Sequence, residues 1–188
     1  FLYFKCAECL EMRLRPVFPS PSSKENFPGQ SKGDVNATRV LLCTMVFFFV
    51  LLPVDIFHFQ VGISLMDGVY YDIAGLVFII GGYIAQIAVF IENRFAIPYS
   101  SNRAQPDQKV ITTGLYRFVR HPMYSSLLIF AIGCSMFFGS YLSMLAVNVL
   151  AVSMVPRILE EEKALKGYLE GYDKYCKEVK NRLVPGIW

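Results

Sequence analysis

Long apolar runs, separated by polar segments, dominate this chain from residue 40 to residue 156. The run 40–62 holds a single acid, Asp55, and the runs 73–91 and 123–156 hold no charged residue. A helix needs about 20 apolar residues to cross a bilayer. Because lipid offers the backbone no hydrogen-bond partners, we expect all three runs to be helical.

The run 123–156 is too long for one membrane span. The sequence Phe-Gly-Ser-Tyr at 138–141 divides it, so two helices of about 16 residues joined by a tight turn fit it better. The largely apolar segment 1–10 adds a partial span. The pattern therefore predicts an all-α integral membrane protein, a single domain over 1–188 with about five transmembrane helices and a C-terminal helical hairpin.

The tail 163–180 follows the hairpin and has a helical period. Leucine and tyrosine side chains recur there at i, i+3, i+4, i+7 and i+10, with lysine and glutamate between them. This pattern predicts one amphipathic helix that lies on the membrane surface or covers a cavity.

Composition supports a membrane protein and excludes some partners. The chain is 54% hydrophobic and 18% charged, whereas soluble domains carry about 25% charged residues. Its net charge of +3 is small and its basic residues do not follow one face, so we expect no nucleic-acid partner. The five cysteines include one CxxC pair at 6–9 without a second pair or a nearby histidine, so we expect no metal site.

The basic residues predict the orientation. Of the 18 lysines and arginines, 17 lie in three polar segments, 13–39, 94–122 and 157–188. The short connections near 64–69 and 138–141 have none. If five helices alternate in direction, the three basic segments share one face, which the positive-inside rule assigns to the cytoplasm. We therefore expect the functional segments 94–122 and 157–188 to face the cytoplasm.

The first candidate for chemistry is the segment 112–124, directly before the hairpin. It contains His121, one of two histidines, followed by Pro122, which suits the first turn of a helix. Two interpretations are open. The arginines and tyrosines of this segment either anchor the protein at the lipid headgroups or form part of a site.

The second candidate is Arg157 with the three acids 160–162 at the end of the last span. Either this is a solvated helix with an i,i+4 ion pair, or an acid at the membrane edge serves a function. A third feature, Asp55 with His58, has too few ligands for a metal site, and we expect a helix end in contact with water.

These segments together resemble the isoprenylcysteine carboxyl methyltransferase family and its bacterial and archaeal relatives. The resemblance rests on ThrThrGlyLeuTyrArgPheValArgHisProMetTyr at 112–124, GluGluGlu at 160–162, GlyTyrAspLysTyr at 171–175 and ArgLeuValProGlyIleTrp at 182–188. It covers the C-terminal half closely, and the N-terminal half only in its helix layout. Two positions depart from the family pattern: Gln108 stands where the family often has histidine, and the register of the family's substrate-side arginine falls on Pro156, beside Arg157.

The resemblance implies S-adenosylmethionine as the methyl donor and a lipid-like or prenylated acceptor in the membrane. It implies cofactor-binding residues at Gln108, Lys109, Val110, Ile111, Tyr116, His121, Pro122, Met123, Tyr124 and Glu160. It implies catalytic roles for Arg157, Glu161 and His121. A carboxylate acceptor needs no general base, whereas an amine acceptor needs one, which His121 or Glu161 can provide.

Three functions are compatible with these residues. The first is carboxyl O-methylation of a prenylcysteine-like acceptor, and the second is N-methylation of a phospholipid amine. The third, from another class, is a nicotinamide-dependent reductase of the membrane sterol type, which shares the Arg-His-Pro motif but generally has a longer chain.

Overall fold

The computed structural model describes residues 32–59, 68–93, 95 and 108–188. This part of the chain is helical and contains no strand, which confirms the all-α class for the described residues. The longer helices are α2 (Lys32–Val54), α3 (Val69–Glu92), α4 (Pro122–Phe137) and α5 (Tyr141–Tyr168). The shorter elements are the π-helical turn η2 (Asp55–Phe59), the 3₁₀ turn η4 (Gly114–Arg117) and α6 (Tyr172–Glu178).

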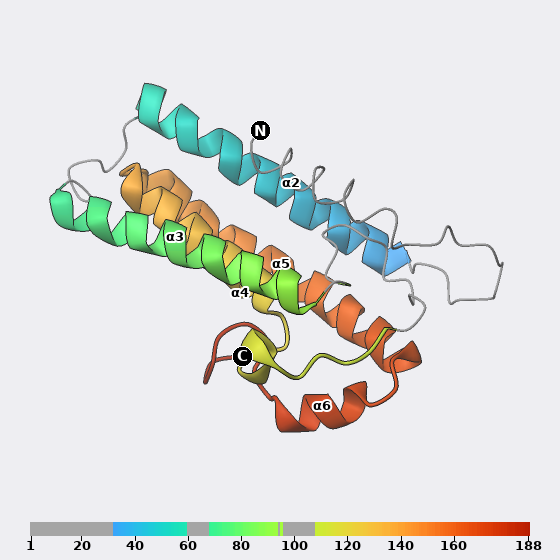
Figure 1. Cartoon of the computed structure of the whole chain (residues 1–188). Helices are drawn as coiled ribbons and strands as arrows, with labels where there is room; N and C mark the ends of the chain where they lie inside the picture. The colour runs from blue at the N-terminus through green and yellow to red at the C-terminus, as the bar shows by residue number, and fades with distance from the viewer. Residues whose placement is uncertain (1–31, 60–67, 94, 96–107) are drawn as a thin grey trace, which may run out of the picture.

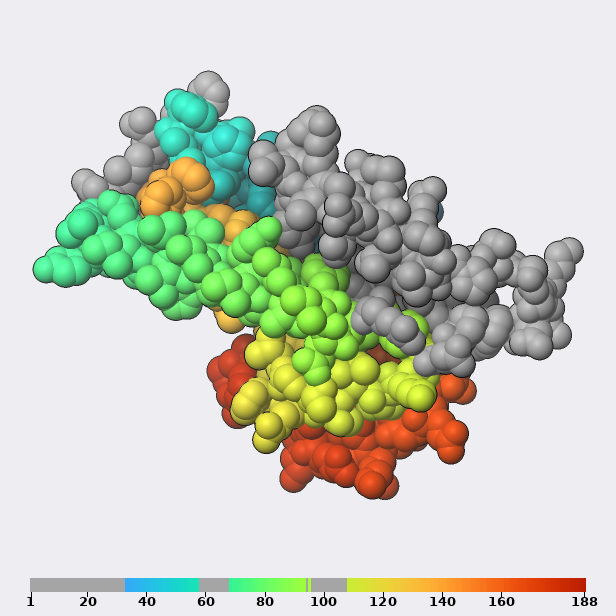
Figure 2. Space-filling model, viewed as in Figure 1, coloured from blue at the N-terminus to red at the C-terminus, as the bar shows by residue number. Residues whose placement is uncertain are grey.

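The four longer helices lie side by side and alternate in direction (Figure 1). α2 packs on α5, α5 on α4, and α4 on α3. The beginnings of α2 and α4 and the ends of α3 and α5 therefore lie at one end of the molecule. At this end, η4 and the segment leading into α4 pack against α6 and the C-terminal residues (Figure 2).

Three helices are long and apolar enough to cross a membrane, at 33–57, 69–92 and 141–168. α4, at 16 residues, is apolar but shorter. Large apolar side chains cover the outward faces, as expected for contact with lipid. They include Phe47, Val50, Ile73, Val77, Ile84, Val149 and Val152. The predicted number of five spans is not confirmed, since the partial span at 1–10 lies outside the described residues.

Glycines bring α3 and α4 into backbone contact. A Cβ atom on Gly75 or Gly82 of α3 would lie 2.5 or 2.7 Å from a backbone nitrogen of α4. From the other side, a Cβ atom on Gly133 would lie 2.6 Å from a backbone nitrogen of α3. Small residues that allow such close approach are a main source of helix association in lipid. α3 and α4 are therefore a tightly packed pair.

The predicted turn at 138–141 is confirmed, and Asp55 stabilises it. Gly139 has a φ of +61°, and Ser140 caps α5 by accepting a hydrogen bond from the Ser143 N–H. The Asp55 carboxylate accepts hydrogen bonds from the Ser140 hydroxyl at 2.7 Å and the Leu142 N–H at 3.3 Å. The expectation of a helix end in water was wrong, because Asp55 is 1% exposed and binds the positive end of α5. The His58 side chain lies outside the described part of the structure.

The last helices differ from the sequence prediction in length. α5 has 28 residues and continues without a break past Pro156, so the second helix of the hairpin is longer than expected. The single amphipathic helix predicted for 163–180 was wrong. α5 ends at Tyr168, Gly171 adopts a left-handed φ of +83°, and α6 begins at Tyr172. This turn directs α6 back toward the beginning of α4.

Candidate functional site

The end of α3 fixes the turn that precedes α4. The Thr113 hydroxyl donates to the Glu92 carboxylate, and the Asn93 amide donates to the Tyr116 hydroxyl at 2.9 Å. Gly114 has a φ of +54°, and a Cβ atom on it would lie 2.6 Å from a Glu92 carboxylate oxygen. The turn therefore favours glycine for its backbone conformation, whereas the Glu92 carboxylate is the end of a flexible side chain that can move.

Tyr116 is held as a neutral phenol inside this turn. It is buried, and its carbonyl accepts a hydrogen bond from the Tyr175 hydroxyl of α6 at 2.8 Å. Burial raises the pKa of Tyr116 to about 12, with a further contribution from the nearby negative charge of Glu161. The same residue thus links the end of α3, η4 and α6.

His121 is the N-cap of α4 and is enclosed by protein. Its backbone N–H donates to the Arg182 carbonyl at 3.0 Å, so the C-terminal segment fixes its position. Its ring is buried and faces two acids of α5. Nε2 lies 3.3 Å from Glu162 Oε1, and Nδ1 lies 3.9 Å from Glu161 Oε1.

Glu162 is the most connected acid of this region. Its buried carboxylate lies 3.0 Å from Arg120 Nη1, and Arg182 Nε is 3.1 Å from both of its oxygens. The Arg182 guanidinium also covers the Trp188 ring, at 5.0 Å from the ring centre. A buried carboxylate needs such partners, because desolvation of an unpaired charge is very unfavourable.

Glu161 is the more accessible acid and connects to a second arginine. Its side chain is 24% exposed and accepts a hydrogen bond from the Tyr124 hydroxyl at 2.9 Å. Arg157 Nη2 lies 3.9 Å from the same Glu161 oxygen, and Arg157 Nη1 donates to the Asp34 carboxylate in the first turn of α2. The two sets of contacts form one polar cluster. It consists of Asp34, Arg120, His121, Tyr124, Arg157, Glu161, Glu162 and Arg182.

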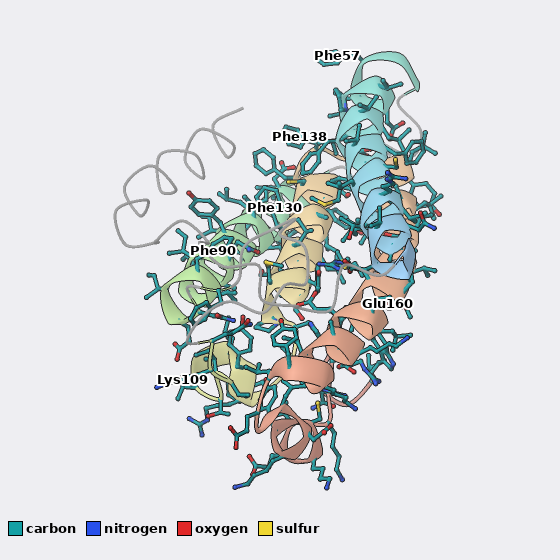
Figure 3. The ribbon with its side chains drawn as sticks, turned by 90° about the vertical axis from the view of Figure 1, so that its right-hand side faces the viewer. Phe57, Phe90, Lys109, Phe130, Phe138 and Glu160 are labelled. Carbon is teal, nitrogen blue, oxygen red and sulfur yellow. The ribbon has the colours of Figure 1, made fainter. Side chains whose placement is uncertain are left out.

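Glu160 lies at the edge of this cluster, beside the first turn of α2 (Figure 3). A Cβ atom on Gly33 would lie 3.1 Å from a Glu160 carboxylate oxygen. The Gln108 side chain contacts the Tyr168 hydroxyl near the end of α5. Glu160 of α5 therefore faces α2, whereas Gln108 contacts α5 near its end.

The other predicted binding residues have different surroundings. Lys109 is exposed, and Pro122 is buried at the first position of α4. Val110, Ile111 and Met123 are half-buried and pack on the aromatic cluster of Tyr116, Tyr172 and Tyr175.

The structure brings four predicted residues into direct contact, His121, Tyr124, Arg157 and Glu161. Sequence reasoning missed Asp34, Arg120, Glu162 and Arg182 as members of the polar cluster. One signal was available for Glu162. The buried residues Leu150, Met154 and Ile158 recur at intervals of four, and Glu162 is the next position on that face of α5.

Comparison with known proteins identifies the segment that contains most of this cluster. Residues 75–167 match the sequence profile of the isoprenylcysteine carboxyl methyltransferase family. Over this segment, the chain is similar to that family.

Two curated relatives are similar to 42% and 56% of the chain. The protein-S-isoprenylcysteine O-methyltransferase of Schizosaccharomyces pombe is 33% identical over 81 residues, which are 42% of this chain and 34% of the relative. A probable protein-S-isoprenylcysteine O-methyltransferase of Oryza sativa subsp. indica is 34% identical over 107 residues, 56% of each chain. The chain thus matches between about a third and about half of the length of these relatives.

The isoprenylcysteine carboxyl methyltransferase segment does not contain the whole cluster. Asp34 in α2 precedes it, and Arg182 follows it. Among the described residues, no group of three or more histidine, cysteine, aspartate or glutamate side chains has an arrangement that could hold a metal ion. The side chains of the polar cluster are carboxylates, guanidiniums, an imidazole and a phenol.

Proposed function

We propose that this protein is a membrane-embedded methyltransferase that uses S-adenosylmethionine to methylate the carboxylate of a prenylcysteine-like acceptor. One observation carries the proposal: within a segment matching the family, His121 and Tyr124 of α4 contact Glu161 of α5 in a polar cluster at one end of apolar helices. The similarity to protein-S-isoprenylcysteine O-methyltransferases of other organisms supports the same reaction.

The charges of the region suit this methyl donor. Four carboxylates, from Asp34 and the acids 160–162, accompany the three guanidiniums of Arg120, Arg157 and Arg182. The His121 ring apart, these carboxylates outnumber the guanidiniums by one. S-adenosylmethionine carries a sulfonium, an ammonium and a carboxylate group, and supplies a methyl group that a carboxylate oxygen can attack directly. The acids nearest the proposed donor site therefore suit a ligand that carries positive groups.

Named residues match the parts of this donor. Glu160 and Glu161 provide carboxylates for the ammonium group, and Tyr116 and Tyr124 provide aromatic rings for the sulfonium or the adenine. Tyr124 and Ser125 already donate their backbone N–H groups to the His121 carbonyl, at 3.1 and 3.2 Å. That leaves the Met123 N–H as the first-turn donor of α4 for the ligand's carboxylate.

The remaining proposed binding residues line the approach to this region. Lys109, Val110 and Ile111 lead from Gln108 toward η4, and Pro122 fixes the direction in which α4 begins. The Tyr172 hydroxyl is buried and has no hydrogen-bond partner in the described part of the chain. It provides a further polar group that a bound molecule can satisfy.

Arg157 is the proposed partner of the acceptor carboxylate. Its guanidinium lies at the edge of the apolar helices, where an acceptor with a prenyl group in the lipid can place its carboxylate. Glu161 accepts a hydrogen bond from Tyr124, and His121 contacts Glu162. These two pairs fix the side chains next to Arg157. A carboxylate nucleophile needs no proton removed, so these residues act by positioning and by charge neutralisation. We place this site on the cytoplasmic side of the membrane, in agreement with the basic segments around it.

The test uses the purified protein in nanodiscs. We expect calorimetry to detect binding of S-adenosylmethionine, and labelled donor to methylate a farnesylcysteine analogue. Alkali should release the label as methanol, as it does from a methyl ester. Arg157→Gln should raise the acceptor KM or abolish transfer, whereas Lys174→Gln, on an exposed side chain, should not.

Other results would contradict the proposal in distinct ways. Alkali-stable label in phospholipid would indicate N-methylation of a lipid amine. Nicotinamide-cofactor binding without S-adenosylmethionine binding would indicate a reductase. Equal activity of Arg157→Gln and Lys174→Gln would remove Arg157 from the acceptor site.

A further inference from the structure

Asp34 reaches the proposed active site from a helix that lies outside the family-matched segment. It belongs to the first turn of α2 and is 3% exposed. Its neighbour Gly33 lies against Glu160, so this turn of α2 packs directly on the acidic turn of α5. The position of the Asp34 carboxylate is therefore set by helix packing rather than by a surface loop.

The Arg157 guanidinium has two carboxylates around it. Asp34 accepts a hydrogen bond from Nη1, and Glu161 lies 3.9 Å from Nη2. Glu161 is additionally held by the Tyr124 hydroxyl. Arg157 itself is 6% exposed, so little water is available to replace a lost partner. A third carboxylate cannot join this pair without displacing one that is already there, because two anions already neutralise one cation.

These two acids are held in different ways. Glu161 is fixed on the same helix as Arg157, at i,i+4, and by Tyr124. Asp34 comes from another helix, and its carboxylate contacts Nη1 of Arg157. Its side chain is a carboxylate on a short stem, which is chemically the same group as the acceptor's reacting end.

We infer that Asp34 is an internal competitor for Arg157 and thereby a specificity-determining residue of the acceptor site. This inference rests on the proposed function. Without acceptor, Asp34 neutralises Arg157. An acceptor carboxylate takes its place on the guanidinium. The carboxylate oxygen bonds to the donor's methyl carbon, the sulfur–methyl bond breaks, and S-adenosylhomocysteine is the leaving group. The resulting neutral ester no longer pairs with Arg157, so Asp34 returns and the product leaves. The site thus distinguishes substrate from product by charge.

The test compares Asp34→Asn with wild type in the nanodisc assay, using a farnesylcysteine analogue and its methyl ester. We expect the acceptor KM to fall by roughly three- to tenfold in Asp34→Asn, because the competing charge is gone. Inhibition by the methyl ester and the KM for S-adenosylmethionine should stay within about twofold. In an Arg157→Gln background, Asp34→Asn should no longer change the affinity for the farnesylcysteine analogue, measured by calorimetry.

The matched control is Asp72→Asn, which changes an exposed acid in the first turn of α3 and should leave all constants unaltered. Asp34→Ser serves as a second variant that removes the charge but keeps an acceptor oxygen. A higher acceptor KM in both Asp34 variants, or an equal change with the ester, would overturn the inference. If neither Asp34 variant folds, the inference is also overturned, because Asp34 then has a structural role. Absence of transfer by the wild type would instead contradict the proposed function.

Discussion

The three adjacent glutamates at 160–162 of α5 have three different surroundings. Successive residues of a helix point about 100° apart. Glu162 therefore faces His121 and two arginines, Glu161 faces Tyr124 and Arg157, and Glu160 faces the first turn of α2. Glu162 is buried, whereas Glu160 and Glu161 are half-buried. This arrangement separates a structural carboxylate from two that remain accessible to a ligand.

We predict that Glu162→Gln destabilises the protein, by about 3 kcal/mol, because it leaves buried guanidiniums without their counter-charge.

Glu160→Ala should keep the melting temperature but weaken binding of S-adenosylmethionine. Glu178→Ala, on an exposed side chain, should change neither. Thermal unfolding in detergent and calorimetry measure the two effects. Equal donor affinity of the Glu160 and Glu178 variants would remove Glu160 from the proposed site.

At this scale, the sequence alone identified half of the polar cluster. His121 and Glu161 stood out because they are rare or clustered residue types at a membrane edge. Asp34 could not be linked to Arg157, since nothing in the sequence indicates which helices pack side by side. Arg120 and Arg182 appeared as ordinary boundary arginines until the C-terminal segment was seen to lie against the beginning of α4.

Among the helices, the α3–α4 pair offers a comparison between neighbouring glycines. We predict that Gly82→Ala destabilises the protein by about 1–3 kcal/mol, because its new Cβ atom would meet backbone atoms of α4. Gly81→Ala is the matched control. A Cβ atom there has no neighbour within 4 Å, and alanine favours the helix. Melting temperatures in detergent should therefore fall for the first variant and hold or rise for the second. A fall of equal size in both would contradict close α3–α4 packing.

The hairpin was predictable because one apolar run was too long for a single span and contained a turn sequence. The break between α5 and α6 was not predicted, because the helical period of leucines and tyrosines continues across it. Gly171 was the available sign, since a glycine often follows the end of a helix in the left-handed conformation. Periodicity reports which face is apolar, and does not by itself report that the chain turns.

For the whole molecule, the described helices agree with the alternation that the charge pattern required. We predict that a cysteine at position 174 is accessible from the cytoplasm and a cysteine at position 70 from the other side. Lys174→Cys and Tyr70→Cys, in a background without the five native cysteines, place exposed thiols at opposite ends of the molecule. An impermeant maleimide applied to intact cells should label only the second. Labelling of only the first would reverse the orientation.

The shortness of α4 has a consequence for where an acceptor meets the site. Its 16 residues rise about 24 Å, compared with roughly 30 Å for the hydrocarbon layer. Arg157 lies at a matching height on α5, 16 residues after its beginning at Tyr141. If the hairpin turn reaches the far headgroups, the cluster lies about 6 Å beneath the near ones, unless the bilayer thins around it. A lipid-anchored acceptor would then meet Arg157 without lifting its chain out of the membrane.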